Sequence, residues 1–184
     1  ELALKDRVLK NRWKLVHKFV LDELSEDQRV GGAIFWRAID ERTGLNFFVK
    51  IYPKFEDSEL DTEARKLFIN ERKMAKKART HLPTVLQIVD SGEADDLRFL
   101  VYPMINGKSL GSRLLSAKTL LEGLTIYEQA LSMVAEIHRQ NIIHNDLSPN
   151  NFLVDDTDEV RLIDWANALE PSDDVETVMG SMVT

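Results

Sequence analysis

Hydrophobic and polar residues alternate through much of the first half of the chain, a pattern typical of β-strands that bury one face. Runs of this kind, separated by turn residues, predict strands at residues 12–20, 33–39, 46–52, 85–90 and 98–102. Apolar residues recur at helical spacing over residues 58–79. We therefore expect a β-rich region that carries one long amphipathic helix.

The second half of the chain begins with helical spacing and ends with another alternating run. A short helix is predicted at 109–116. A longer helix is predicted to begin at Thr125, because Glu128 follows it at capping-box spacing. The apolar residues alternate again over 152–163, which predicts a β-hairpin that turns at 155–158.

The loop before this hairpin carries the most distinctive chemistry, reading Ile-His-Asn-Asp-Leu-Ser-Pro-Asn-Asn over residues 143–151. Asp146 and Asn151 lie in the loop, and Asp164 ends the second strand of the hairpin. Oxygen ligands in this arrangement suit a Mg²⁺ ion shared with phosphates. Asp146 would then remain to orient a hydroxyl nucleophile. An Asp- and Asn-rich turn that serves only the backbone is the alternative, and the loop by itself leaves both open.

A lysine interrupts the apolar strand predicted at 46–52. Lys50 either extends to solvent or neutralises a buried negative charge. Glu71 falls within the apolar stripe of the helix at 58–79, where an unpaired carboxylate is costly. We therefore predict a Lys50–Glu71 pair; the alternative is two half-exposed charges at the ends of their elements.

Composition and charge narrow the functional classes. The 184 residues are 43% hydrophobic and 30% charged, as in ordinary folded proteins of one or two small domains. The net charge of −7 argues against a broad surface for nucleic acid or an anionic membrane. The absence of cysteine excludes thiol chemistry. No apolar run approaches the roughly 20 residues of a membrane span, and no signal peptide is visible.

Taken in order, these residues resemble the motifs of protein kinases, or more broadly of kinase-fold phosphotransferases, with bacterial-type Ser/Thr kinases as the expected group. The matching motifs are Lys50, its helical partner Glu71, His144-Asn145-Asp146 with Asn151, and Asp164-Trp165-Ala166. The resemblance implies an α+β, bilobal fold with a truncated helical C-lobe. It places the N-lobe at 1–102, the hinge at 103–108 and a partial C-lobe at 109–184, which ends within the activation segment.

The resemblance also implies ATP and Mg²⁺ as cofactors. The residues expected to act in catalysis are Asp146, Lys50 and Glu71, and those expected to bind the metal are Asn151 and Asp164. Nucleotide contacts are implied for Gly31, Gly32, Lys50, Pro103, Ile105, Asn151 and Asp164.

The sequence departs from the family pattern around the nucleotide. Gln28, Val30 and Ala33 align with the glycines of the phosphate loop, although Gly31 and Gly32 lie among them. Two phenylalanines, Phe35 and Phe48, replace smaller residues near adenine, where they would either stack on the base or fill its place. Asn145 replaces the arginine that contacts a phosphorylated activation segment.

The expected activity is ATP-dependent transfer of phosphate to protein serine or threonine. The alternatives are a small-molecule kinase of the choline or aminoglycoside type, with a small hydroxyl-bearing substrate, and a pseudokinase that acts as a binding module. A cytoplasmic protein is expected. Because the chain begins at Glu1 and ends within the activation segment, we expect it to be part of a longer protein. Residues 1–184 alone should be poorly stable and inactive unless the missing C-lobe or a partner surface completes them.

Overall fold

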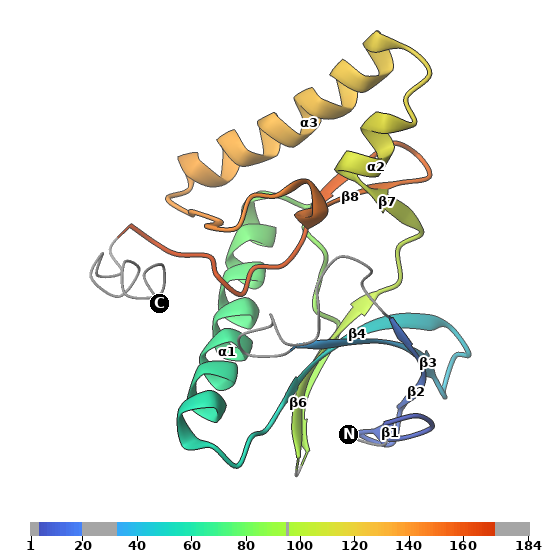
Figure 1. Cartoon of the computed structure of the whole chain (residues 1–184), viewed down its shortest axis with the longest axis vertical. Helices are drawn as coiled ribbons and strands as arrows, with labels where there is room; N and C mark the ends of the chain where they lie inside the picture. Colours follow the sequence, from blue (N-terminus) through green and yellow to red (C-terminus); the bar gives the residue numbers. More distant parts are fainter. Residues whose placement is uncertain (1–3, 20–32, 95, 172–184) are drawn as a thin grey trace. The chain divides into compact units, whose positions relative to one another are not determined.

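A computed structural model of the chain describes residues 4–19, 33–94 and 96–171 (Figure 1). Two compact units make up the fold. The first unit comprises residues 1–72 and 87–105, and the second comprises 73–86 and 106–184. The predictions for Gly31, Gly32 and the activation segment at 173–184 lie outside the described residues.

The first unit is built on a six-stranded antiparallel sheet with the strand order β1-β2-β3-β4-β6-β5. The strands predicted near 12–20, 33–39, 46–52 and 98–102 are all present in it. Its members are β1 (Val8–Leu9), β2 (Trp13–Phe19), β3 (Ile34–Asp40), β4 (Asn46–Pro53), β5 (Asp90–Ala94) and β6 (Leu97–Pro103).

The strand predicted at 85–90 is wrong in its position, because β5 begins only at Asp90 and runs to Ala94. Close packing explains the shift better than hydrophobic alternation does. The Asp90 carboxylate accepts a hydrogen bond from Trp13 Nε1 at 2.7 Å, which ties the start of the strand to β2. A Cβ atom on Gly92 would lie 2.9 Å from Phe99 Cζ, so the edge strand fits against β6 through a residue without a side chain.

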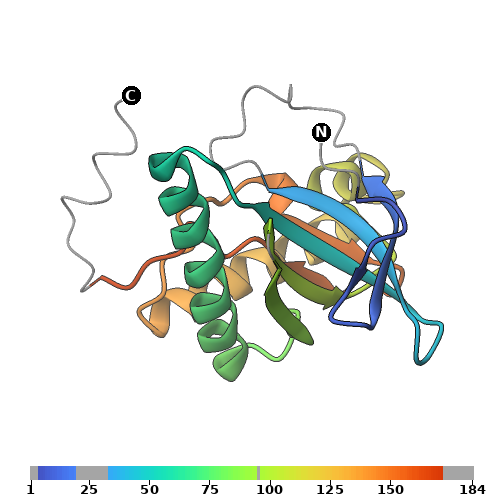
Figure 2. The same ribbon diagram turned by 90° about the horizontal axis from the view of Figure 1, so that it is seen from below.

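The two faces of the sheet carry different residues. Val49 and Ile51 of β4 belong to the hydrophobic core, together with Trp13, Leu15, Trp36, Ala38, Leu97, Phe99 and Val101. Because side chains alternate along a strand, Lys50 and Tyr52 point to the opposite face. That face meets helix α1 (Ser58–His81), which lies beside the sheet in Figure 2. Phe68 of α1 packs against Tyr52 with ring centroids 5.9 Å apart.

Helix α1 confirms the long helix predicted at 58–79. It begins after Asp57, whose carboxylate accepts hydrogen bonds from the backbone N–H groups of Glu59 and Leu60 at 2.9 and 3.0 Å. These bonds satisfy donors that have no partner within the first turn of a helix. The helix contributes residues up to Arg72 to the first unit, and its last turns belong to the second unit.

The second unit combines helices with a three-stranded sheet of order β7-β8-β9. The predicted hairpin and short helix are both present, whereas strand β7 was not predicted. A Cβ atom on Gly107 would lie 2.5 Å from the carbonyl oxygen of Val154, so only glycine allows β7 to approach β8 this closely. The elements are β7 (Gly107–Ser109), α2 (Leu110–Leu115), α3 (Leu120–Arg139), the 3₁₀ helix η2 (Pro149–Asn151), β8 (Phe152–Asp155) and β9 (Val160–Leu162).

The predicted start of the longer helix at Thr125 is wrong. Helix α3 begins one and a half turns earlier, with Thr119 as its N-cap, and Thr119 Oγ1 accepts a hydrogen bond from Glu122 N at 3.1 Å. Both Thr119 and Thr125 precede a glutamate at the same spacing. The capping pattern occurs twice, and tertiary contacts select the first: Glu122 also binds Lys118 N at 2.7 Å and the Arg113 guanidinium.

We predict that the two threonines respond differently to the same substitution. Thr119→Ala removes the N-cap and should destabilise the protein by about 1 kcal/mol. Thr125→Ala should be neutral or slightly stabilising, because the Thr125 hydroxyl only donates to Leu121 O within the helix, and alanine is the better helix former. Chemical denaturation of both variants measures the difference. Equal losses of stability would contradict the assignment of Thr119 as the cap.

Candidate functional site

The predicted Lys50–Glu71 pair is present in the first unit. Lys50 Nζ lies 2.9 Å from Glu71 Oε2, and the two side chains expose only 6% and 2% of their surface. Strand β4 supplies the lysine and helix α1 supplies the glutamate. The alternative of two half-exposed charges is therefore wrong.

Two tyrosines complete the surroundings of Glu71, and sequence reasoning missed this role for both. The Tyr102 hydroxyl donates to Glu71 Oε1 at 2.7 Å, and the Tyr52 hydroxyl donates to Glu71 Oε2. Both rings are buried. The signal was available for Tyr52, because residues two apart on a strand share a face and Tyr52 follows Lys50 at that spacing.

Aromatic rings also surround the Lys50 ammonium. Its Nζ lies 5.4 Å from the ring centroid of Tyr52 and 5.9 Å from that of Phe35. Phe35 in turn stacks on Phe48, with centroids 5.7 Å apart and an interplanar angle of 22°. Ring faces attract a cation through their quadrupole, so both rings add to the attraction between Glu71 and the ammonium group.

The expected nucleotide-contact residues Pro103 and Ile105 lie at the end of the same sheet. Pro103 is the last residue of β6 and pairs with Phe47 of β4, and Ile105 follows in irregular structure. Both are half-buried. Proline has no amide hydrogen, so Pro103 offers only its carbonyl.

In the second unit, hydrogen bonds connect the loop at 143–151 to the hairpin. Asn151 Nδ2 donates to the carbonyl oxygen of Asp146 at 2.8 Å. The carbonyl oxygen of Asn151 accepts from Ile163 N at 2.9 Å, at the end of β9 and one residue before Asp164. Asn151 therefore links the two predicted acids through its side chain and its backbone.

Both ends of this network adopt unusual backbone conformations. Asn145 has φ 60° and Asp164 has φ 62°, in the left-handed region that non-glycine residues rarely occupy. Strained residues of this kind persist only where the surrounding structure holds them, and they concentrate at functional sites. A hydrogen bond from Ala166 N to Asp164 Oδ1 at 3.4 Å accompanies the second one.

His144 is buried beneath the surface and connects the loop at 143–151 to the residues that follow strand β9. Its ring is fully buried, its Nε2 lies 3.0 Å from the carbonyl oxygen of Ile163, and Trp165 packs edge-on against it with centroids 4.9 Å apart. Burial lowers the pKa of His144 below its usual value, and nearby hydrogen bonding and acids only partly oppose this. Its burial and these contacts give His144 a structural role in the loop.

The donor set in this unit fits a metal that is shared with another ligand. The described residues hold no group of three or more His, Cys, Asp or Glu side chains that could bind a metal. Mg²⁺, however, commonly takes one or two protein ligands and completes its shell with phosphate and water. Because the Asn151 amide nitrogen binds the Asp146 carbonyl, the amide oxygen is the atom that this side chain can offer a cation.

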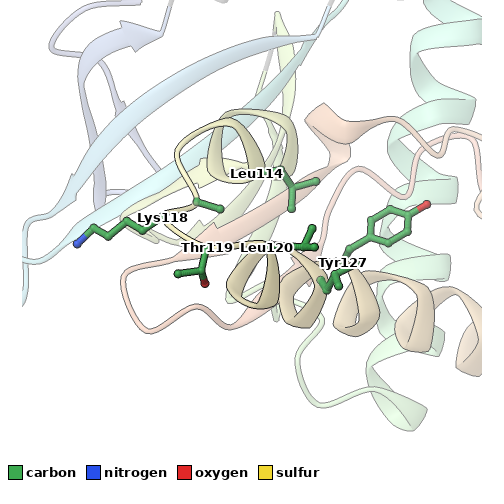
Figure 3. A pocket seen from close by; sticks show the side chains of 8 residues that line it. Leu114, Lys118, Thr119, Leu120 and Tyr127 are labelled. Atoms are coloured by element: carbon green, nitrogen blue, oxygen red, sulfur yellow. The ribbon is translucent and has the colours of Figure 1, made fainter.

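A hollow lies between α2 and α3 in the second unit (Figure 3). Leu114, Leu120 and Tyr127 line it together with Lys118 and Thr119. It contains none of the residues predicted to act in catalysis or binding. In the described parts of the chain, no helix is both long and apolar enough to cross a membrane.

The chain is similar to known proteins along most of its length. The profile of the protein kinase domain matches residues 31–183. Phosphorylase b kinase gamma catalytic chain, liver/testis isoform, of Bos taurus is 29% identical over 153 residues, which cover 79% of this chain and 37% of that protein. Serine/threonine-protein kinase PrkC of Bacillus subtilis is 32% identical over 106 residues (54% and 16%), and calcium-dependent protein kinase 5 of Plasmodium berghei is 27% identical over 170 residues (90% and 29%).

The α+β architecture is consistent with these matches. The first unit is rich in β-strands, the long helix α1 extends from it, and the second unit contains helices α2 and α3. The chain belongs to the protein kinase domain family. The family and fold predicted from the sequence are thereby confirmed, and the similar proteins include both bacterial and eukaryotic kinases. The chain spans less than two fifths of the length of each of these curated relatives.

We predict that His144 makes the protein less stable in mild acid. The folded state holds His144 at a lowered pKa, so it binds fewer protons than the unfolded chain, in which histidine titrates near its usual pKa of about 6.5. The stabilising effect is therefore complete above that value and is lost as the pH falls below it. The temperature of thermal unfolding should therefore fall between pH 7.5 and 5.5. In His144→Gln, this fall in unfolding temperature should be smaller. The control is His138→Gln on the exposed side of α3; an unchanged slope in His144→Gln would contradict the prediction.

Proposed function

We propose that this chain is the catalytic part of an enzyme that transfers the γ-phosphate of ATP to serine or threonine hydroxyls of proteins. The observation that carries the proposal is the buried Lys50–Glu71 pair, a charged exception between two apolar surfaces. Membership of the protein kinase domain family and the name of the Bacillus subtilis relative support the same activity.

In the first unit, Lys50 would bind the α- and β-phosphates and Glu71 would hold Lys50 in place. The Pro103 carbonyl and the Ile105 amide would contact the adenine base, and the amides of Gly31 and Gly32 would approach the phosphates. The chain contributes position and charge to this reaction and no covalent chemistry of its own.

In the second unit, Asn151 and Asp164 would hold Mg²⁺, which supplies neutralisation of the charge that develops on the phosphate oxygens. Asp146 would orient the substrate hydroxyl and accept its proton. The hydrogen bond from Asn151 to the Asp146 carbonyl supports this division of roles, because it keeps the acid beside a predicted metal ligand.

The division into an N-lobe at 1–102, a hinge at 103–108 and a partial C-lobe at 109–184 is part of the same proposal, as is a cytoplasmic location. A protein substrate is favoured over a small hydroxyl-bearing one, because the Bacillus subtilis and Plasmodium berghei relatives are both named as protein kinases. The alternatives of a small-molecule kinase and a pseudokinase gain no support from them.

Replacing the lysine tests the activity directly. Lys50→Met in the complete protein should abolish phosphate transfer, because the phosphates lose their cation, with only a modest loss of folding stability. Lys66→Met on the exposed surface of α1 is the matched control and should keep full activity. Transfer from labelled ATP to a mixed peptide substrate measures both. Full activity in Lys50→Met would overturn the assignment of Lys50.

The two acids should separate binding from turnover. Asp164→Asn should raise the Mg²⁺ concentration required and weaken the affinity for Mg-ATP. Asp146→Asn should leave that affinity near wild type and lower kcat by a factor on the order of 10²–10⁴, the usual contribution of a positioned acid or base. Titration calorimetry with Mg-ATP and steady-state kinetics distinguish the two. An equal loss of Mg-ATP affinity in both variants would contradict the roles given to them.

A further inference from the structure

The carboxylate of Glu71 is held at both of its oxygens. Oε1 accepts the Tyr102 hydroxyl at 2.7 Å. Oε2 accepts the Tyr52 hydroxyl and also faces Lys50 Nζ at 2.9 Å. A carboxylate bound through one oxygen can still rotate about its carbon–carbon bond, whereas contacts to both oxygens from different directions fix its plane.

The sheet places the two hydroxyls on either side of the lysine. Lys50 and Tyr52 share one face of β4 because they are two residues apart. On the neighbouring strand β6, Leu100 lies opposite Lys50 and Tyr102 lies opposite Phe48. Tyr102 thus belongs to the same face, one strand away from Tyr52 and on the other side of Lys50.

Burial makes these hydrogen bonds strong and their loss costly. Lys50, Glu71, Tyr52 and Tyr102 each expose at most 7% of their surface. Hydrogen bonds to an ionised acceptor are about twice as strong as neutral ones, and a low-dielectric interior strengthens them further. A buried carboxylate with a single lysine partner would keep acceptor sites without donors, which is the costly situation for a buried charge.

We propose that Tyr52 and Tyr102 are positioning residues that hold Glu71, and through it Lys50, in the arrangement that binds ATP phosphates. All four residues belong to the first unit. The proposal rests on the function proposed above only in giving Lys50 the phosphates as its ligand. Neither tyrosine hydroxyl needs to touch the substrate or the nucleotide.

The packing of the rings allows the hydroxyls to be tested separately. Tyr52 packs on Phe68 of α1 with centroids 5.9 Å apart, and Tyr102 lies 6.4 Å from Phe48. Phenylalanine keeps these ring contacts and removes the hydroxyl. Tyr127, the third tyrosine of the chain, is exposed on α3, so Tyr127→Phe removes a hydroxyl that does not contact Glu71 and serves as the control.

The first measurement is steady-state kinetics of the complete protein. Tyr52→Phe and Tyr102→Phe should each lower kcat/KM for ATP by a factor on the order of ten, the effect of one hydrogen bond to a charged group, mainly by raising KM. The double variant should lose more than either single variant, and Tyr127→Phe should match wild type. In a Glu71→Gln background, where the acceptor is neutral, the same changes should cost much less.

The second measurement does not depend on phosphate transfer. Acylation of Lys50 by an amine-reactive ester, followed by peptide mass spectrometry, reports how often the lysine leaves Glu71, and Lys66 provides an internal reference. The rate at Lys50 should rise about tenfold in each single Tyr→Phe variant. Single variants suffice if the double variant does not fold.

The outcomes separate this proposal from the proposed function. If wild type transfers no phosphate, the proposed function fails, and the Lys50 acylation rate still decides the role of the tyrosines. An unchanged acylation rate in both single variants would overturn the positioning role, with or without a change in activity. A loss of kcat/KM that is as large in the Glu71→Gln background would also overturn it, because the hydroxyls would then act without Glu71.

Discussion

The buried ion pair between Lys50 and Glu71 requires the sheet and helix α1 of the first unit to stay in a fixed relative position. Removing two charges from water costs several kcal/mol for each ion, and their attraction offsets this only where the geometry is good and the remaining polar sites are satisfied. The sheet and helix α1 must therefore hold a fixed register. Arg98 on β6 provides a second point of attachment, donating to both Asp61 oxygens at 3.0 and 2.7 Å. Asp61 and Glu71 lie roughly 15 Å apart along the helix at 1.5 Å per residue, so the two contacts fix its direction on the sheet.

The second unit meets a different constraint, because its predicted acids lie in a loop and at a strand end. Main-chain hydrogen bonds take the place of a buried ion pair there. The Asn151 side chain and carbonyl connect the carbonyl of Asp146 to the amide of Ile163. Buried His144 contacts the Ile163 carbonyl from the other side. Asn145 and Asp164, which adjoin these bonds, adopt the left-handed conformation that asparagine and aspartate reach more easily than most other residues.

The sequence predicted those features in which one chemical rule decides the outcome. Lys50 and Glu71 are the charged exceptions on apolar faces, so burial requires them to meet, and they do. Prediction from the sequence failed where two segments carried the same local signal, or where tertiary packing overrode the alternation of hydrophobic and polar residues. Thr119 and Thr125 carry the same capping signal, and only the contacts of Glu122 distinguish them. The contact of the Tyr102 hydroxyl with Glu71 required knowledge of strand pairing, because Tyr102 reaches that face through the β4–β6 register.

The aromatic side chains near Lys50 have two effects: some lie close to its ammonium group, and others form an apolar surface beside it. The position of the ammonium is set by Glu71 and by ring faces at 5.4 and 5.9 Å, all supplied by the first unit itself. The stack of Phe35 on Phe48 occupies the same face of the sheet, yet both rings remain half-buried rather than enclosed. A flat ligand arriving there would meet aromatic faces, against which offset stacking is favourable, instead of small aliphatic side chains. The charge with which we propose that Lys50 recognises phosphate, and the aromatic surface beside it, are therefore separate features of one face of the sheet.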